Sequence, residues 1–279
     1  MKHLLYPILY MALLAILSLP SSLLAAPTFV THHPAQAFVW IEQESALPIL
    51  VDAKEDKGIL RAIAHLQADA QEVAGVIPPL VNTITAKRLV IIGSLQGSHF
   101  IQELVKAGKI DGLQLEGKRE KFLIQTIQNP FEGVEEALVI AGSDKRGTIY
   151  GIYELSTQMG VSPWYFWADV PVEKQSLVAI RRGTYTDGEP AVKYRGIFLN
   201  DEWPSLGGWA TATFGGFNSR FYEKVFELIL RLKGNFLWPA MWASAFYDDD
   251  PLNGPLADEM GIVMSTSHRE PMGLSLIHI

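Results

Sequence analysis

The first part of the chain mixes the periodicities of strands and helices. Apolar runs at 47–51 and 88–93 are short and typical of buried strands. Between them, residues 56–74 place apolar side chains on one broad face and polar side chains largely on the rest. This pattern predicts an amphipathic helix between two strands.

A second group of elements follows. Residues 121–127 and 137–141 have the pattern of paired strands joined by a turn, and residues 146–159 that of a helix that Gly160 ends in a left-handed conformation. Together with the first group they predict a sheet covered by two helices. We assign residues 27–188 to one N-terminal α/β domain.

After the polar segment 183–190, which contains Gly and Pro and which we interpret as a linker, short strands and helices alternate strictly. The expected strands are 194–199, 235–239 and 262–266. A Gly-rich loop to Gly216 follows the first strand, and then a helix that begins at Asn218 or Ser219 and ends at Gly234, with a short helix at 255–260 before the third strand. The apolar side of the longer helix consists of Phe221, Val225, Leu228 or Ile229, and Leu232. Three βα units in succession predict parallel strands with right-handed crossovers.

Reactive and sugar-binding side chains gather where these three strands end. The candidates are Asp201, Glu202 and Trp203 at the first strand, Trp238, Met241 and Trp242 at the second, and His268, Arg269 and Glu270 at the third. Residues past the carboxyl ends of parallel strands share one face, on which barrel enzymes build their active sites. The opposite strand ends carry no comparable groups, so we expect a single site at the carboxyl ends.

The residue types at this edge suit glycoside hydrolysis. That reaction needs one carboxyl group to protonate the leaving oxygen and another to activate water or attack directly. The candidate catalytic carboxyls are Asp201, Glu202 and Glu270, and the candidate substrate-binding residues are Trp203, Trp238, Met241, His268 and Arg269. The alternative is that Asp201 and Glu202 form a solvated pair or a cap, and that His268 is structural.

Two other groups have simpler interpretations. The aromatic segment 164–167 fits either a sugar-stacking platform or packing between domains, and we favour packing. Residues 248–250 are three consecutive aspartates, which cannot all face one metal ion. We therefore expect a solvated turn or a helix start there, and the sequence predicts no metal site.

The amino terminus has the pattern of a secretory signal peptide. A short basic start precedes an apolar stretch over 4–19, and small residues end at Ala25 and Ala26. The stretch is interrupted by proline and shorter than the about 20 apolar residues that span a bilayer. We expect residues 1–26 to be removed, with cleavage after Ala25 or Ala26, and the protein to be periplasmic or extracellular.

Composition narrows the classes of partner. With 279 residues, 48% hydrophobic and 19% charged, the chain can form one large or two ordinary domains with true cores. A net charge of -7 without runs of Lys or Arg argues against a nucleic-acid partner and, after signal cleavage, against a membrane partner. The chain has no cysteine, so an exported form has no disulfide framework.

Four longer strings give a more specific indication. They are YRGIFLNDEW, LKGNFLWPAMW, DDDPLNGPLADEMGIVMSTSHREPM and, upstream, GSDKRGTIYGIYELSTQMGVSPWYFWADVPV. In this order they resemble glycoside hydrolase family 115, and the similarity runs from about residue 30 to residue 272. The resemblance implies a xylan α-1,2-glucuronidase that removes glucuronic or 4-O-methylglucuronic acid from xylan or glucuronoxylo-oligosaccharides, with inversion and without a cofactor.

The same resemblance implies the fold. The expected class is α/β, with a small N-terminal α+β domain followed by the first three βα units of a truncated (β/α)8 barrel over 189–273. Residues 274–279, LSLIHI, depart from the family pattern, and we interpret them as a non-native tail. A barrel cut after three strands has an open apolar edge, so we expect the chain as written to be inactive.

The resemblance also places residues in a uronic-acid pocket. Asp201, Trp238, and His268 with Glu270 match three motif elements of the family, whose general acid and base are expected on later strands. Arg269 stands where the family more often has a second histidine, and an arginine there could bind the sugar carboxylate through two hydrogen bonds. A family 20-type hexosaminidase and a non-catalytic exported carbohydrate-binding protein remain as alternatives, and a homodimer of the full-length protein is left open.

Overall fold

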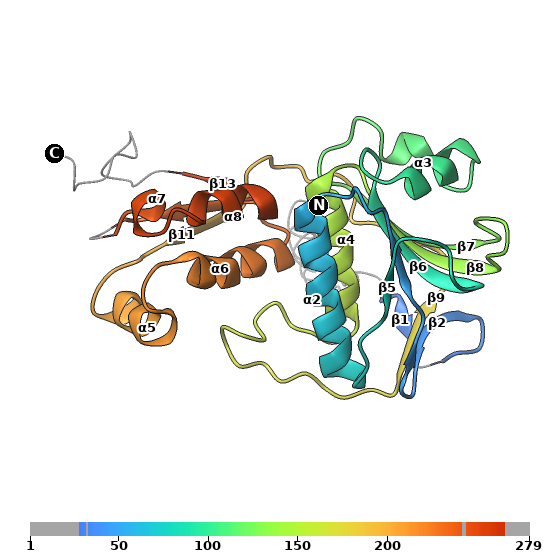
Figure 1. The fold of residues 1–279 in the computed structure, drawn as a ribbon, viewed down its shortest axis with the longest axis horizontal. Helices are drawn as coiled ribbons and strands as arrows, with labels where there is room; N and C mark the ends of the chain where they lie inside the picture. Colours follow the sequence, from blue (N-terminus) through green and yellow to red (C-terminus); the bar gives the residue numbers. More distant parts are fainter. Residues whose placement is uncertain (1–27, 32, 242–243, 266–279) are drawn as a thin grey trace, which may run out of the picture.

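The computed structural model describes residues 28–31, 33–241 and 244–265. Two helices, α2 and α4, stand side by side at the centre of Figure 1. The sheets of the N-terminal part lie on one side of this pair, and a smaller parallel sheet with its helices lies on the other. The candidate site residues belong to the smaller part.

A six-stranded sheet forms the centre of the N-terminal part, in the order β10-β7-β8-β6-β4-β5. Its strands are β4 (Ile49–Val51), β5 (Leu80–Val81), β6 (Arg88–Ser94), β7 (Phe122–Gln128), β8 (Glu136–Gly142) and β10 (Thr184–Tyr185). Strand β7 runs antiparallel to both neighbours, while β8, β6, β4 and β5 are parallel. The strands predicted near residues 47, 88, 121 and 137 are confirmed. The expected linker begins later than predicted, because Thr184 and Tyr185 pair with β7.

A second sheet is antiparallel throughout. Its strands, in the order β1-β9-β2-β3, are β1 (Val30–Thr31), β9 (Leu177–Arg181), β2 (Ala37–Glu42) and β3 (Ser45–Ala46). This sheet places Phe38, Trp40 and Ile180 in the hydrophobic core, where each is nearly inaccessible to solvent. These side chains join the core formed by the first sheet and helices α2 and α4.

The two central helices begin and end as their sequence predicts. Helix α2 (Lys57–Ala74) is capped by the Asp56 carboxylate, which accepts from the Gly58 amide at 2.8 Å, and Gly75 ends it at φ 74°. Helix α4 (Lys145–Gln158) is capped by Asp144 in the same way. Helix α3 (His99–Lys106) contributes Phe100, Ile101 and Leu104 to a second core that contains Leu89 and Ile91 of β6.

The second part contains three parallel strands in the order β11-β12-β13, which confirms the expected βα succession. Its elements are β11 (Gly196–Leu199), α5 (Ser205–Phe214), α6 (Ser219–Arg231), β12 (Phe236–Pro239), α7 (Phe246–Asp249), α8 (Asn253–Met260) and β13 (Val263–Met264). Asn218 caps α6, and Gly261 ends α8 at φ 79°. The described strands form an open sheet, in agreement with the start of a barrel.

Two expectations in this part are wrong. The Gly-rich segment expected as a loop contains helix α5, in which Ala210 is fully buried and Gly207 lies against the Trp203 ring. A Cβ at Gly207 would come within 2.8 Å of that ring, so glycine here serves close packing. Leu232 does not share the buried face of α6: the helix ends at Arg231, Lys233 turns the chain at φ 58°, and Leu232 is 44% exposed.

The aromatic segment at 164–167 packs between the two parts, as favoured from the sequence. Trp167 contacts Trp209 of α5 at a ring-centroid distance of 5.6 Å and Phe221 of α6 at 6.2 Å. Its indole Nε1 donates to the Lys224 carbonyl at 3.1 Å. Only Trp164 of this segment is strongly exposed, at 45%.

The amino ends of β11 and β12 are not chemically bare, which corrects the expected asymmetry. Glu120, completely buried at the start of β7, accepts from Asn235 Nδ2 at 2.7 Å, Arg195 Nη2 at 2.6 Å and Arg146 Nε at 2.5 Å. Burial by itself raises the pKa of Glu120, but these hydrogen bonds and charges outweigh it and lower the pKa. The network ties the sheet of the second part to the N-terminal part.

No helix among residues 28–31, 33–241 and 244–265 is long and apolar enough to span a lipid bilayer.

Candidate functional site

The carboxyl ends of β11 and β12 lie together at one edge of the parallel sheet. Leu199 pairs with Pro239 in the register of the two strands, and the Ala240 amide donates to the Leu199 carbonyl at 2.9 Å. Asp201 follows the first strand by two residues, and Met241 follows the second by the same distance. The parallel register therefore brings these two positions to the same edge.

Asp201 is the best-defined polar residue of this edge. Its side chain is fully buried, and its Oδ2 accepts a hydrogen bond from the Ser244 hydroxyl at 2.7 Å. Ser244 belongs to the segment between β12 and α7, so the contact joins the segments that follow two neighbouring strands. A buried carboxyl held in this way is positioned before any substrate arrives.

Two further groups lie close enough to Asp201 to interact with it electrostatically. Tyr222 of α6 is fully buried, and burial raises the pKa of its hydroxyl, with the charges of Asp201 and Asp249 adding to the effect. Burial also raises the pKa of Asp249, and the charges of Asp201 and Asp248 act in the same direction. These groups therefore retain protons more readily than in water, a property that proton-transferring sites share.

Neither Ser244 nor Tyr222 was among the residues predicted from the sequence. The ring of Tyr222 packs edge-on against Phe246 of α7 at 4.6 Å, and the side chain is fully buried next to the predicted core residue Phe221. From the sequence, Tyr222 is therefore indistinguishable from a residue that only packs in the core. For Ser244 the sequence offers no signal, because its role depends on a contact across 43 positions.

Glu202 and Trp203 extend from the buried end of β11 to the surface. Glu202 is half-buried, and its backbone carbonyl accepts from the Gly207 amide at 2.9 Å, which links it to the first turn of α5. Trp203 is 56% exposed. The adjacent acidic residues thus have different surroundings, Asp201 inside the fold and Glu202 nearer to solvent.

Trp238 and Phe198 form an aromatic face on the sheet. They are register partners on β12 and β11, their rings meet edge to face at 5.5 Å, and they are 38% and 48% exposed. Met241, partly buried beyond Trp238, has a left-handed backbone at φ 54°, an uncommon conformation for a non-glycine residue. The face offers ring surface to a sugar beside the buried carboxyl.

Five of the predicted positions lie at the carboxyl ends of β11 and β12: Asp201, Glu202 and Trp203 follow β11, Trp238 lies near the end of β12, and Met241 follows it. Trp242, His268, Arg269 and Glu270 lie outside the described residues. In the described ranges no group of three or more His, Asp or Glu side chains is arranged to hold a metal ion. Of the three consecutive aspartates, Asp248 and Asp249 lie in the short helix α7, and Asp250 accepts from the Ser219 amide at 2.8 Å.

Comparison with known proteins identifies relatives of both parts. The sequence model of Glycosyl hydrolase family 115 matches residues 187–277. A solved family GH115 4-O-methyl-α-glucuronidase, with specificity for decorated arabinogalactans, is 32% identical and superposes with a TM-score of 0.72 over 85% of this chain. The chain spans only 30% of that enzyme's length.

Other solved structures are more distant. A variant of the Streptomyces plicatus β-hexosaminidase is 13% identical, with a TM-score of 0.49 over 86% of this chain and 46% of its own. The Flavobacterium johnsoniae chitobiase is 11% identical, with a TM-score of 0.47 over 86% of this chain and 33% of its own. No curated protein sequence matches the chain.

Proposed function

This chain belongs to glycosyl hydrolase family 115, and we propose that the intact protein is a glycosidase that removes glucuronic or 4-O-methylglucuronic acid side chains from xylan. The observation that carries the proposal is the buried Asp201 carboxyl, held by Ser244 at the carboxyl end of a barrel strand. The 32% identity to a 4-O-methyl-α-glucuronidase supports the same reaction class.

The proposed reaction is hydrolysis with inversion. One carboxyl group protonates the glycosidic oxygen as its bond to the anomeric carbon breaks, and a second takes a proton from the water that attacks the opposite face. Asp201 contributes to the carboxyl constellation that binds the sugar and orders this water. Trp203 and Trp238 offer their exposed ring surface to the sugar.

The third strand completes the proposed pocket. By the family resemblance, His268 and Glu270 bind the uronic acid, and Arg269 pairs with its carboxylate. We assign the general acid and base to neither Asp201 nor Glu202, because the family places them on later strands. Export through the signal peptide over residues 1–26 is part of the proposal, since xylan is a polymer outside the cell.

Arabinogalactan is the second candidate substrate. The similar protein is a 4-O-methyl-α-glucuronidase with specificity for decorated arabinogalactans. We favour xylan from the four sequence strings that resemble the xylan-active family. The two substrates share the acid sugar and differ in the main chain that the protein must accommodate.

The test is to incubate the intact protein separately with glucuronoxylan and with glucuronidated arabinogalactan, and to follow the released acid by proton NMR. We expect faster release from glucuronoxylan, with the β-anomer of the acid appearing first because the α-linkage is inverted. First appearance of the α-anomer would contradict inversion, and faster release from arabinogalactan would contradict the choice of polymer. Release of N-acetylhexosamine from a hexosaminide instead would replace the proposal with the hexosaminidase alternative.

A further inference from the structure

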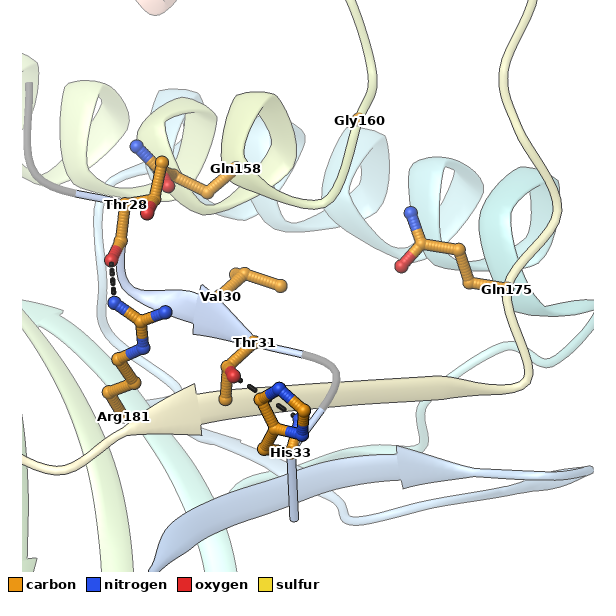
Figure 2. Close-up of a pocket in the computed structure, with 8 residues that line it drawn as sticks. All are labelled: Thr28, Val30, Thr31, His33, Gln158, Gly160, Gln175 and Arg181. Atoms are coloured by element: carbon orange, nitrogen blue, oxygen red, sulfur yellow. Dashed lines mark hydrogen bonds between the residues drawn. The ribbon is translucent and has the colours of Figure 1, made fainter. Parts of the chain in front are cut away.

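A polar pocket lies in the N-terminal part, between strand β1 and the carboxyl end of helix α4. It has a volume of about 400 Å³, large enough for a monosaccharide. Figure 2 shows the side chains of Gln158, Gln175 and Arg181 around it, with Thr31 and His33 at its lower rim. In Figure 1 strands β1 and β9 lie across α2 and α4 from β11, so the pocket is separate from the strand-end site.

Two cationic or proton-binding side chains line this pocket, and none of its lining residues is acidic. Arg181 is exposed, and its Nη1 donates to the Thr28 carbonyl at 3.2 Å. Within the described ranges its Nε and Nη2 atoms have no partner, and neither has the imidazole of His33. A guanidinium with free donors is the usual partner of a carboxylate.

The remaining wall is built of amides and a glycine. Gln158 is fixed, because its Oε1 accepts from the Phe29 amide at 3.3 Å and its Nε2 donates to Glu154 at 2.9 Å. Gln175 Nε2 donates to the Met159 carbonyl at 2.9 Å, while its buried Oε1 meets no donor among the described residues. That oxygen is inaccessible to solvent, so a ligand in the pocket meets the second amide hydrogen of each glutamine instead.

The left-handed Gly160 keeps this wall free of a further side chain. Its φ is 99°, and a Cβ placed there would lie 3.5 Å from Gln175 Nε2. The pocket therefore has the Arg181 guanidinium beside Thr28 and Gln158, with His33 and Gln175 farther along it. That arrangement matches a small polyhydroxylated molecule that carries one carboxylate.

We propose that this pocket binds a uronic acid sugar at a second site, with Arg181 on the carboxylate and with His33 and the amide wall toward the hydroxyls. The choice of an acid sugar rests on the proposed function, since a glucuronidase meets such sugars in both its substrate and its product. Binding at this site would keep the protein attached to a polysaccharide that carries uronic acid side groups, and the site would take no part in hydrolysis.

The experiment titrates the intact protein with sodium glucuronate and, as the neutral counterpart, with glucose. The protein carries Asp201→Ala, so that binding at the strand-end site is weakened, and is compared with the same protein that also carries Arg181→Gln. We expect glucuronate to bind at least about tenfold more tightly than glucose, and Arg181→Gln to remove about tenfold of that affinity. His33→Gln should lower it as well, whereas Lys118→Gln, an exposed cation remote from the pocket, should leave it unchanged.

Equal affinity for glucose and glucuronate, or glucuronate binding that Arg181→Gln leaves unchanged, would overturn the second site. Hydrolysis separates this inference from the proposed function. Arg181→Gln in the otherwise unaltered protein should release acid from a small aryl glucuronide at the unaltered rate. Arg181-dependent binding of glucuronate by a protein that shows no hydrolase activity would support the second site and contradict the proposed function. Hydrolase activity without Arg181-dependent binding would support the proposed function and contradict the second site.

Discussion

Arg231 of α6 and Asp69 of α2 form a two-point ion pair between the two parts of the molecule. Nη1 and Nη2 of the arginine donate to the two carboxylate oxygens at 2.9 and 3.0 Å, and both side chains are almost completely buried. Arg231 Nε also donates to Glu227 at 2.9 Å, and Glu227 accepts from the Tyr165 hydroxyl. This buried network fixes α6, and with it Tyr222 beneath the strand-end site, against the N-terminal part.

Removing one member of this pair should destabilise the protein strongly. Asp69→Ala leaves the buried guanidinium with only part of its compensation, so we expect a loss of about 3 kcal/mol in the free energy of unfolding. Urea unfolding followed by tryptophan fluorescence measures it. The matched control is Glu135→Ala, whose partner Lys87 is exposed, and it should leave the midpoint almost unchanged. Equal midpoints for the two variants would show that the buried pair does not hold the parts together.

The same network gives a pH dependence with a definite sign. Burial by itself raises the pKa of Glu227, but the charges of protonated His65, Arg231 and Lys224 outweigh it and lower the pKa to about 2. A lowered carboxyl pKa stabilises the fold above the unfolded value, here 4.5, and the contribution disappears as pH falls from there to about 2. Burial lowers the pKa of His65, so the part of this contribution that comes from the His65 charge is present only below that pKa.

Glu227→Gln keeps the size of the side chain and removes its charge. The stability gap between the unaltered protein and this variant should therefore be wide above pH 4.5 and narrow steadily below it. Urea unfolding at a series of pH values gives the gap directly. A gap that stays constant between pH 7 and pH 3 would mean that the charge of Glu227 does not contribute.

Ser244 should act on the reaction through Asp201. Ser244→Ala removes the hydrogen bond at 2.7 Å, and we expect kcat/KM for a small aryl glucuronide to fall about tenfold, with a loss of about 1 kcal/mol in the free energy of unfolding because a buried carboxylate loses a partner. A positioning role also moves the acid limb of the pH profile of kcat/KM. Ser205→Ala, at the exposed start of α5, serves as the matched control. A Ser244→Ala enzyme with the rate and pH profile of the control would exclude this role.

Trp238 should bind sugar through its exposed ring. Trp238→Ala is expected to raise KM for polymeric substrate about fivefold, because one aromatic contact surface is lost. Trp164→Ala removes a somewhat more exposed tryptophan from the aromatic segment of the N-terminal part and should leave KM unchanged. The opposite outcome, with polymer binding dependent on Trp164, would favour a sugar platform at that segment.

Local signals in the sequence were sufficient for most of the fold. Asp56 and Gly75 mark the ends of α2 because capping depends on residues within one turn. The parallel order of β11, β12 and β13 follows from the alternation of short strands and helices. Helix α5 was missed because its glycines indicate a loop, whereas in the fold Gly207 packs against the Trp203 ring and Ala210 is buried in the core.

The sequence predicted where the candidate site lies but not which residues surround Asp201. Asp201 and Trp238 are recognisable because they end parallel strands, and the topology brings such positions to one edge. The residues that interact with Asp201 do not end parallel strands, so this rule does not predict them. Ser244 lies in a segment without a regular pattern, and Tyr222 looks like any other aromatic residue on the buried face of α6. The buried Glu120 network at the opposite end could not be predicted either, since its members come from four separate segments.

The most direct test of the account is the rate at which the intact protein releases 4-O-methylglucuronic acid from glucuronoxylan, measured beside its Asp201→Ala variant. The account predicts release by the unaltered protein and a loss of at least about a hundredfold in the variant, with Ser205→Ala retaining the full rate and all three proteins showing equal secondary structure by circular dichroism. Undiminished release by Asp201→Ala would place the active site elsewhere, and no release by the unaltered protein would contradict the proposed glucuronidase.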